Sequence, residues 1–175
     1  MRAGLGTAAA LVAAVAGIFI ATNTGGEGVK GYTLKETLPQ MVSDFGAATQ
    51  VVEISVAHDN VDYKVIPRDG QLHIRNYDLV QYEIQAGTAG YNRKVTNVVR
   101  APTAGETSQA HATLGQIDPE VTDRLLHKVG FSRNDSSATL DGLAWVLESV
   151  QGPSSAYIAT LDGGHVHRAN GSPTP

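Results

Sequence analysis

Two histidines near the carboxyl end, His165 and His167, have the spacing of a pair of metal ligands. Side chains two residues apart on a strand lie on the same side, so both imidazoles could bind Zn²⁺ or Cu²⁺. A firm site needs a third ligand, for which Asp162, His73 and His111 are the candidates. The alternative interpretation is an exposed strand edge that follows a turn.

Two further patterns could support chemistry. Asp59-Asn60-Val61-Asp62 resembles the start of a calcium loop, but the later glycine and the terminal glutamate are missing, which favours a polar hairpin turn. The serine pairs Ser136-Ser137 and Ser154-Ser155 have no Gly-x-Ser-x-Gly elbow around them. Since the chain shows no assembled nucleophile, base or metal signature, we expect it to have no enzymatic activity and no cofactor.

Aromatic residues are the remaining candidates for a binding site. Tyr91 stands between Gly90 and Asn92 in a predicted loop, residues 86–92, so it is the best candidate for contact with a partner. Four other aromatic residues fall at inward positions of alternating strands, which favours core packing: Tyr63, Tyr82, Trp145 and Tyr157.

Composition narrows the possible functions. The 175 residues include 13 Lys and Arg and carry a formal net charge of −4. The cations are scattered, whereas nucleic-acid binding needs them clustered, so we expect no nucleic-acid partner. The chain has no cysteine, which excludes disulfides, thiolate nucleophiles and cysteine metal sites. The length fits one domain or two small ones.

The first 24 residues are hydrophobic, and Arg2 is their only charged side chain. As a helix, Ala3–Ala21 would cover about 28 Å, which is close to the thickness of a bilayer core. We predict a retained transmembrane anchor that leaves the rest of the chain outside the cytoplasm. A signal peptide cleaved near Ala16 and a buried soluble helix are the alternatives. Residues 25–32 are predicted to form a flexible tether.

Residues 33–100 read as a first helix-plus-sheet unit. Apolar spacing predicts a helix over Thr33–Phe45 that Thr33 and Glu36 cap and Gly46 ends. Alternating residues then predict strands over Gln50–Ala57 (with Val52, Ile54 and Val56 on one face), Asp62–Ile66, Leu72–Ile74, Leu79–Gln85 and Arg93–Arg100.

Residues 101–116 are small and polar, and they predict a linker or a long loop. A second unit, residues 117–170, begins with a helix that Asp118 caps and Gly130 ends. Leu140–Gln151 fits a helix or a strand, and the turn that follows it favours a strand. A strand over Ala156–Leu161 comes next, and residues 171–175 form a polar tail.

The two units share an order of helix, strands and an Asp-Gly turn. Asp69-Gly70 and Asp162-Gly163 both favour a tight hairpin, because Gly and Asp tolerate positive φ. We therefore interpret the repetition as structural. The predicted fold class is α+β: a transmembrane helix followed by two helix-plus-antiparallel-sheet repeats.

This order resembles the tandem αβ repeats of β-lactamase inhibitor proteins and of exported PepSY-like modules over about Thr33–Asn170. The resemblance lies in the two Asp-Gly turns, in Trp145-Val146-Leu147, and in Gly152-Pro153 followed by Ala156-Tyr157-Ile158. It implies an exported α+β protein that binds other proteins. Those inhibitors contain disulfides and this chain has no cysteine, so no binding residue is transferred.

Together these features predict a non-catalytic binding protein on the outer face of a cell membrane. Its partner would be a protein, a peptide or an envelope component, bound through sheet faces and the 86–92 and 101–115 loops. One alternative is a structural subunit that self-associates through its membrane helix and sheet edges. Another is a secreted, inhibitor-like protein released by signal cleavage.

Overall fold

The computed structural model describes residues 30–85, 88–149 and 156–170. Three α-helices lie in this part of the chain: α1 (Leu34–Phe45), α2 (Ala104–Gln109) and α3 (Val121–Val129). The strands are β1 (Gln50–Val56), β2 (Val61–Ile66), β3 (Leu72–Gln85), β4 (Thr88–Arg100), β5 (Ala112–Thr113), β6 (Ser136–Asp141), β7 (Ala144–Ser149), β8 (Ala156–Thr160) and β9 (Val166–Arg168). Short 3₁₀ turns η1 (Leu114–Gln116) and η2 (Arg133–Asp135) complete the list.

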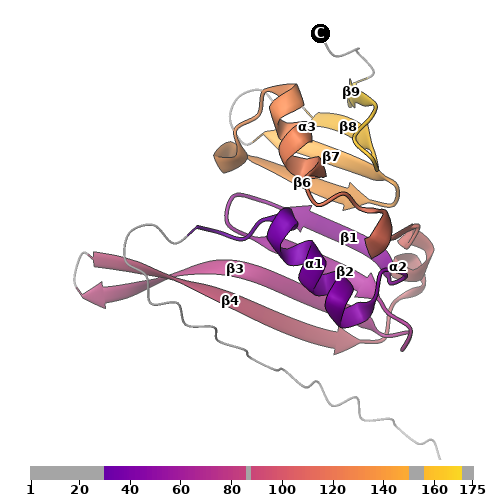
Figure 1. Cartoon of the computed structure of the whole chain (residues 1–175), viewed down its shortest axis with the longest axis horizontal. Coiled ribbons are helices and arrows are strands. Elements are labelled where there is room, and N and C mark those ends of the chain that lie inside the picture. Colours follow the sequence, from indigo (N-terminus) through magenta and orange to yellow (C-terminus); the bar gives the residue numbers. More distant parts are fainter. Residues whose placement is uncertain (1–29, 86–87, 150–155, 171–175) are drawn as a thin grey trace, which may run out of the picture.

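All nine strands of the described chain belong to one antiparallel sheet, in the order β4-β3-β2-β1-β6-β7-β8-β9, with β5 on β1. The sheet is continuous because β1 pairs with β6 in its middle, from Glu53 opposite Asp141 to Val56 opposite Ala138. Helices α1 and α3 lie on the same face of the sheet, α1 over β1 and β2 and α3 over β6 and β7, and α2 lies at one end of the sheet (Figure 1).

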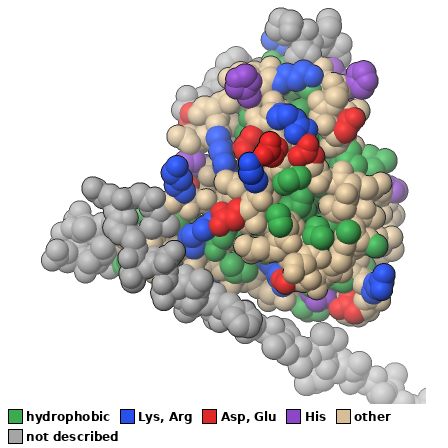
Figure 2. Space-filling model, in the orientation of Figure 1, with side chains coloured by type: hydrophobic (Ala, Val, Ile, Leu, Met, Phe, Trp, Pro, Cys, Tyr) green, Lys and Arg blue, Asp and Glu red, His purple; other side chains and the backbone are tan. Residues whose placement is uncertain are grey.

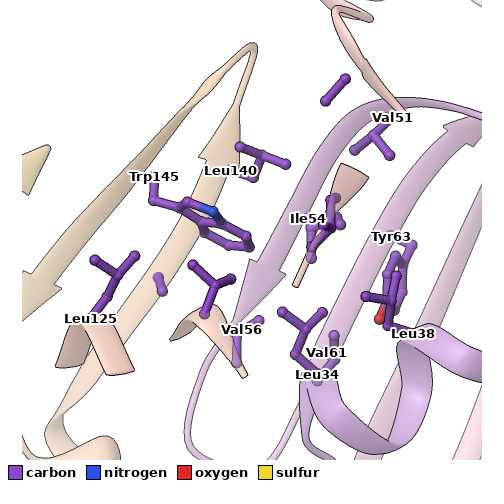
Figure 3. Packing of buried hydrophobic residues seen from close by; sticks show 14 of the residues in the cluster. Leu34, Leu38, Val51, Ile54, Val56, Val61, Tyr63, Leu125, Leu140 and Trp145 are labelled. Carbon is purple, nitrogen blue, oxygen red and sulfur yellow. The ribbon is translucent and has the colours of Figure 1, made fainter. Parts of the chain in front are cut away.

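The core lies between the sheet and α1 and α3. Residues that face the helices lie opposite one another on neighbouring strands and form rows across the sheet. Two of these rows are almost wholly buried. The first is Tyr77, Val61, Val56, Ala138, Leu147 and Tyr157, and the second is Tyr63, Ile54, Leu140, Trp145 and Ala159. Both helices add apolar residues to this single cluster, including Leu38 and Leu125. Figure 3 shows Trp145, Leu140 and Ile54 next to one another across the β1–β6 junction. The two helices therefore share one core.

The two larger helices form where the sequence predicts them. Thr33 caps α1 by accepting a hydrogen bond from the Glu36 N–H, and Gly46 ends the helix with a φ of 92°. Helix α3 begins at Val121, slightly later than predicted, because Asp118 accepts from the Glu120 N–H before the first turn. Gly130 ends α3 in the left-handed conformation.

Both predicted Asp-Gly hairpins are confirmed, with φ of 71° at Gly70 and 74° at Gly163. A third Asp-Gly turn, at Asp141-Gly142, was not predicted. It divides the ambiguous segment Leu140–Gln151, which places Leu140 and Trp145 opposite each other on β6 and β7. The preference for strand over helix was therefore right for residues 144–149, but the segment contains a hairpin.

The predicted fold class is wrong. The described chain is mainly one nine-stranded antiparallel sheet with few helices, because the β1–β6 pairing and the shared core join the two expected repeats into one unit. None of its helices has the length and apolar character needed to cross a membrane. The predicted anchor, residues 1–24, and most of the predicted tether lie outside the described residues, as does the tail from residue 171.

Residues 101–116, predicted to be a linker or a long loop, contain regular structure. A capping box between Thr103 and Glu106 holds α2, and β5 then pairs with the start of β1. Strand β6 pairs only with the later residues of β1, from Glu53 to Val56. Strand β5 supplies backbone partners for the first residues of β1, Gln50 and Val51. Ala112 and Leu114 are fully buried as a result.

A bulge in β1 makes the predicted inward face of this strand, Val52, Ile54 and Val56, wrong at Val52. The β1–β2 register shifts between Val51 and Glu53, so Val51 joins the main core with Ile54 and Val56. Val52 instead joins a small second cluster with Ile66 and Leu72. An extra residue in one strand of an antiparallel pair has this effect, because side chains alternate with a period of two.

The shared core predicts a single unfolding transition. Trp145 is fully buried and donates from Nε1 to the Leu161 carbonyl at 3.1 Å. Trp145→Ala should lower the free energy of unfolding by about 3–5 kcal/mol, measured by urea denaturation and circular dichroism. Leu143→Ala, at a side chain that is 55% exposed, is the matched control and should change it by less than about 0.5 kcal/mol. Two separate transitions, only one of them moved by Trp145→Ala, would contradict the shared core.

Candidate functional site

The β3–β4 hairpin extends beyond the rest of the sheet (Figure 1). The last β2–β3 pair is Val61 with Tyr77, whereas β3 and β4 continue to pair with each other as far as Gln85 and Thr88. We call the part beyond Tyr77, residues 78–85 and 88–94, the arm. The predicted loop at 86–92 is therefore wrong from Thr88 onward, since Tyr91 lies in β4 opposite Gln81. Isolated two-stranded ribbons are marginally stable in water, so contacts at its base matter.

A hollow of about 420 Å³ lies at the base of the arm. Five segments meet there: the residues before α1, the β1–β2 turn, β3, β4 and η2. Its walls are formed by Lys30, Gly31, Thr33, His58, Asp59, Leu79, Tyr91, Arg133 and Asn134. Tyr91, the predicted partner contact, thus lies in the wall of this hollow and is 37% exposed.

Tyr32 fixes the segment that precedes α1 against the body of the protein. The Arg93 guanidinium lies 3.8 Å from the centre of its ring and also pairs with Glu36. Tyr77 packs edge-to-face on the same ring at 5.2 Å. The Tyr32 backbone N–H donates to the Asp59 carbonyl, and the Tyr32 carbonyl accepts from the Arg133 guanidinium at 2.9 Å. The arm, the β1–β2 turn and η2 are therefore held together around one residue.

Gly31, in the wall of the hollow, lies close against the backbone of the β1–β2 turn. A Cβ at Gly31 would overlap the backbone of Asp59, so only glycine allows this close approach. Charges of both signs surround the hollow. Lys30 and Arg133 bring cations, and Asp59 brings a carboxylate whose Oδ2 lies 3.4 Å from His58 Nε2. Leu79 and Tyr91 add apolar surface. Such a mixture can bind a peptide-like ligand, which offers carbonyls, N–H groups and side chains of either charge.

The sheet face opposite α1 and α3 forms a second, more open surface. One row crosses all eight main strands: Thr96, Asn76, Asp62, Ser55, Thr139, Val146, Ile158 and His167. Burial raises the pKa of Asp62, and the nearby Asp78 and Glu53 carboxylates raise it further. Asp62 Oδ1 is buried and has no hydrogen-bond partner in the described part of the chain. This carboxylate is therefore held at a cost to stability.

The predicted metal ligands lie away from the hollow, and one of them, His167, belongs to the row on the open sheet face. His165 follows the Asp162-Gly163 turn and His167 lies on β9, and both are exposed. Asp162 accepts hydrogen bonds from Thr160 and from the Gly164 N–H, while His73 bonds Asp69 at 2.9 Å. Within residues 30–85, 88–149 and 156–170, no three His, Asp or Glu side chains are grouped as a metal site.

The other predicted motifs have structural roles in the described part of the chain. Asp59-Asn60 forms the β1–β2 turn, in which the Ala57 N–H donates to the Asn60 carbonyl. The Ser136 hydroxyl donates to the Ser132 carbonyl, and Ser154-Ser155 lies outside the described residues. Tyr63, Trp145 and Tyr157 are buried as predicted. Tyr82 is only partly buried, on the arm, where its ring covers Gly90.

Sequence patterns missed most of the hollow. Lys30, Gly31 and Tyr32 fall within or beside the predicted tether, so their composition suggested flexibility. The Arg133–Tyr32 hydrogen bond joins residues 101 positions apart, a separation that no local pattern indicates. The signal that was available is the position of Tyr91 between Gly90 and Asn92.

Comparison with known protein families, with curated proteins and with solved structures found no match to this chain. The resemblance to β-lactamase inhibitor proteins and PepSY-like modules therefore stays a prediction.

The raised pKa of Asp62 gives a pH-dependent prediction. Its carboxylate is disfavoured in the folded state, so this cost is full at neutral pH and disappears as the pH falls through the folded pKa towards about 4, the ordinary value. Asp62→Asn should therefore raise the urea midpoint at pH 7 and leave it unchanged near pH 3. Asp141→Asn, on an exposed residue of the same face, is the control. Destabilisation by Asp62→Asn at pH 7 would show that the carboxylate has a stabilising partner.

Proposed function

We propose that this protein is a non-catalytic binding protein of the cell envelope. Its hydrophobic N-terminal segment holds it at the outer face of the membrane, and the hollow at the base of the arm binds a segment of another protein. The observation that carries the proposal is the hollow itself: about 420 Å³, with charges of both signs and the side chains of Leu79 and Tyr91 in its walls.

The size and chemistry of the hollow favour a protein ligand. A volume near 420 Å³ accommodates a few side chains of a peptide, at the lower end of ordinary ligand sites. Tyrosine and arginine, which line it as Tyr91 and Arg133, are enriched among residues that dominate binding at protein interfaces. Arg133 is held in place by Tyr32, so little side-chain conformational freedom remains to be lost when a partner binds.

The position of the hollow in the chain supports a role close to the membrane. Lys30 and Gly31 form part of its wall, and Lys30 comes only six positions after residue 24, the end of the hydrophobic segment. Six residues span at most about 20 Å. A partner in the hollow would then be held near the membrane surface.

A second candidate is a structural subunit that self-associates. The long edge strand β4 favours it, because free strand edges can pair with another copy. Crosslinking in membranes would then give discrete oligomers of this chain alone. A secreted, inhibitor-like protein is the third possibility, and N-terminal sequencing of the native protein tests it: a start at Gly17 or Thr22 would contradict retention at the membrane.

Site-specific crosslinking tests the hollow. A photoactivatable residue at Tyr91 should form an adduct with another protein in intact cells, whereas the same residue at the exposed Leu143 should not. Leu79→Arg fills the hollow and should weaken capture about tenfold or more, as loss of a central interface contact does. Leu143→Arg is the matched control for that change. Equal adducts from both positions, or capture unaffected by Leu79→Arg, would contradict the proposal.

A further inference from the structure

Three Asp-Gly pairs occur in turns of the chain: Asp69-Gly70, Asp141-Gly142 and Asp162-Gly163. An aspartate that precedes glycine can isomerise without an enzyme, because no side chain shields the backbone nitrogen that attacks its carboxyl group. The reaction needs a carboxyl group that is free to turn towards this nitrogen and a glycine N–H that is not engaged elsewhere. The three turns differ in both respects.

The first of these aspartates is held by hydrogen bonds. Asp69 Oδ1 accepts from the Gln71 N–H at 2.9 Å, and its Oδ2 bonds the His73 imidazole at 2.9 Å. The Gly70 N–H donates to the Pro67 carbonyl at 3.1 Å. The Gln71 hydrogen bond, with the help of His73, keeps the pKa of Asp69 below its ordinary value, so the carboxyl group stays in its less electrophilic, ionised form.

The last turn is held in the same way. Asp162 Oδ1 accepts from the Thr160 hydroxyl at 2.6 Å and from the Gly164 N–H at 3.0 Å. The Gly163 N–H donates to the Thr160 carbonyl at 2.8 Å. The Thr160 hydrogen bond, more than any other contact, keeps the pKa of Asp162 below its ordinary value. In both turns, several hydrogen bonds must therefore break before the glycine nitrogen can reach the carboxyl carbon.

The Asp141-Gly142 turn has neither restraint. It is a two-residue hairpin loop in which Asp141 pairs with Ala144 and Gly142 takes a φ of 62°. Asp141 is exposed, and within the described residues its carboxylate accepts no hydrogen bond and the Gly142 N–H donates none. Ring closure turns the Asp141 carbonyl and opens the pair with Ala144 next to the turn. Local openings of this kind cost much less than global unfolding.

We infer that Asp141 is a site of spontaneous isomerisation to isoaspartate. The Gly142 nitrogen forms a bond to Cγ of Asp141, and its proton leaves with the carboxyl hydroxyl group as water, which gives a five-membered succinimide. Water then adds to one of the two ring carbonyls, and the C–N bond at that carbon breaks. Cleavage at Cγ restores aspartate. Cleavage at the backbone carbonyl carbon leaves the chain running through Cβ, and water is the only other reactant.

The modification lengthens the backbone at a place where three strands meet. Asp141 lies opposite Glu53 in the β1–β6 pairing and opposite Ala144 in the β6–β7 hairpin. An additional backbone atom at this position disturbs the pairing on both sides, as an extra residue does in a β-bulge. The site is independent of the hollow, whose walls contain neither Asp141 nor Gly142.

Ageing of the full-length protein in detergent at neutral pH, followed by peptide mapping, tests the inference. Isoaspartate has the same mass as aspartate, so it is detected by resistance to an aspartate-specific protease and by methylation with an isoaspartyl methyltransferase. Isoaspartate should accumulate at Asp141 at least about tenfold faster than at Asp69 or Asp162, because hydrogen bonds must break first at those two sites. In protein unfolded by urea, the three rates should become similar, since glycine follows each aspartate.

Two variants separate the structural cause from the sequence, and their urea midpoints check that they fold. Asp141→Glu should leave this turn unmodified, because the six-membered ring that glutamate would form closes much more slowly. Thr160→Val removes the hydroxyl that donates to Asp162, so isoaspartate should rise at Asp162 and stay unchanged at Asp141. Equal rates at the three sites of the folded protein, or an unchanged rate at Asp162 in Thr160→Val, would overturn the inference.

Discussion

The antiparallel pairing of β1 with β6 is the interaction on which the rest of the structure depends. It joins two series of strands into one sheet and brings α1 and α3 onto the same face. Ile54, Leu140 and Trp145 then lie in a single buried row, so the core crosses the junction without interruption. Neither helix would bury its apolar side as fully over half of this sheet.

The arm and the hollow at its base exist because neighbouring strands of the sheet differ in length. Strand β2 has 6 residues and β3 has 14, so β3 and β4 must continue as a ribbon beyond the sheet. Tyr32 and Arg93 hold the base of the ribbon against α1, and Gly31 and Tyr91, close to them in the chain, line the hollow. On the helix-bearing face, Lys and Arg side chains are interspersed with Asp and Glu (Figure 2). Shape and individual ion pairs, more than a long-range electrostatic field of one sign, would therefore select a partner there.

Local signals explain what the sequence could predict. The caps at Thr33 and Gly130 and the turns at Gly70 and Gly163 depend on residues close in the chain, and the structure has them where they were expected. Long-range pairing has no such signal. The β1–β6 junction and the use of β5 to complete β1 depend on partners dozens of residues away, and the bulge that turns Val52 away from the main core depends on the register with β2.

The candidate site was predicted only in part for the same reason. Tyr91 was singled out by its flanking residues, although it lies on a strand and not in a loop. Gly31 and Tyr32 looked like tether because their role depends on Asp59, Arg93 and Arg133, which come from three other segments. Composition describes how a segment behaves alone, whereas these residues are ordered by what packs against them.

Native-state hydrogen exchange tests the central claim, that one core across the β1–β6 junction unifies the molecule, most directly. The amides of Ile54 on β1 and Leu140 on β6 should exchange with the same free energy, equal to that of global unfolding, because opening either strand breaks the shared core. Two distinct free energies, with one strand exchanging while the other stays protected, would contradict it.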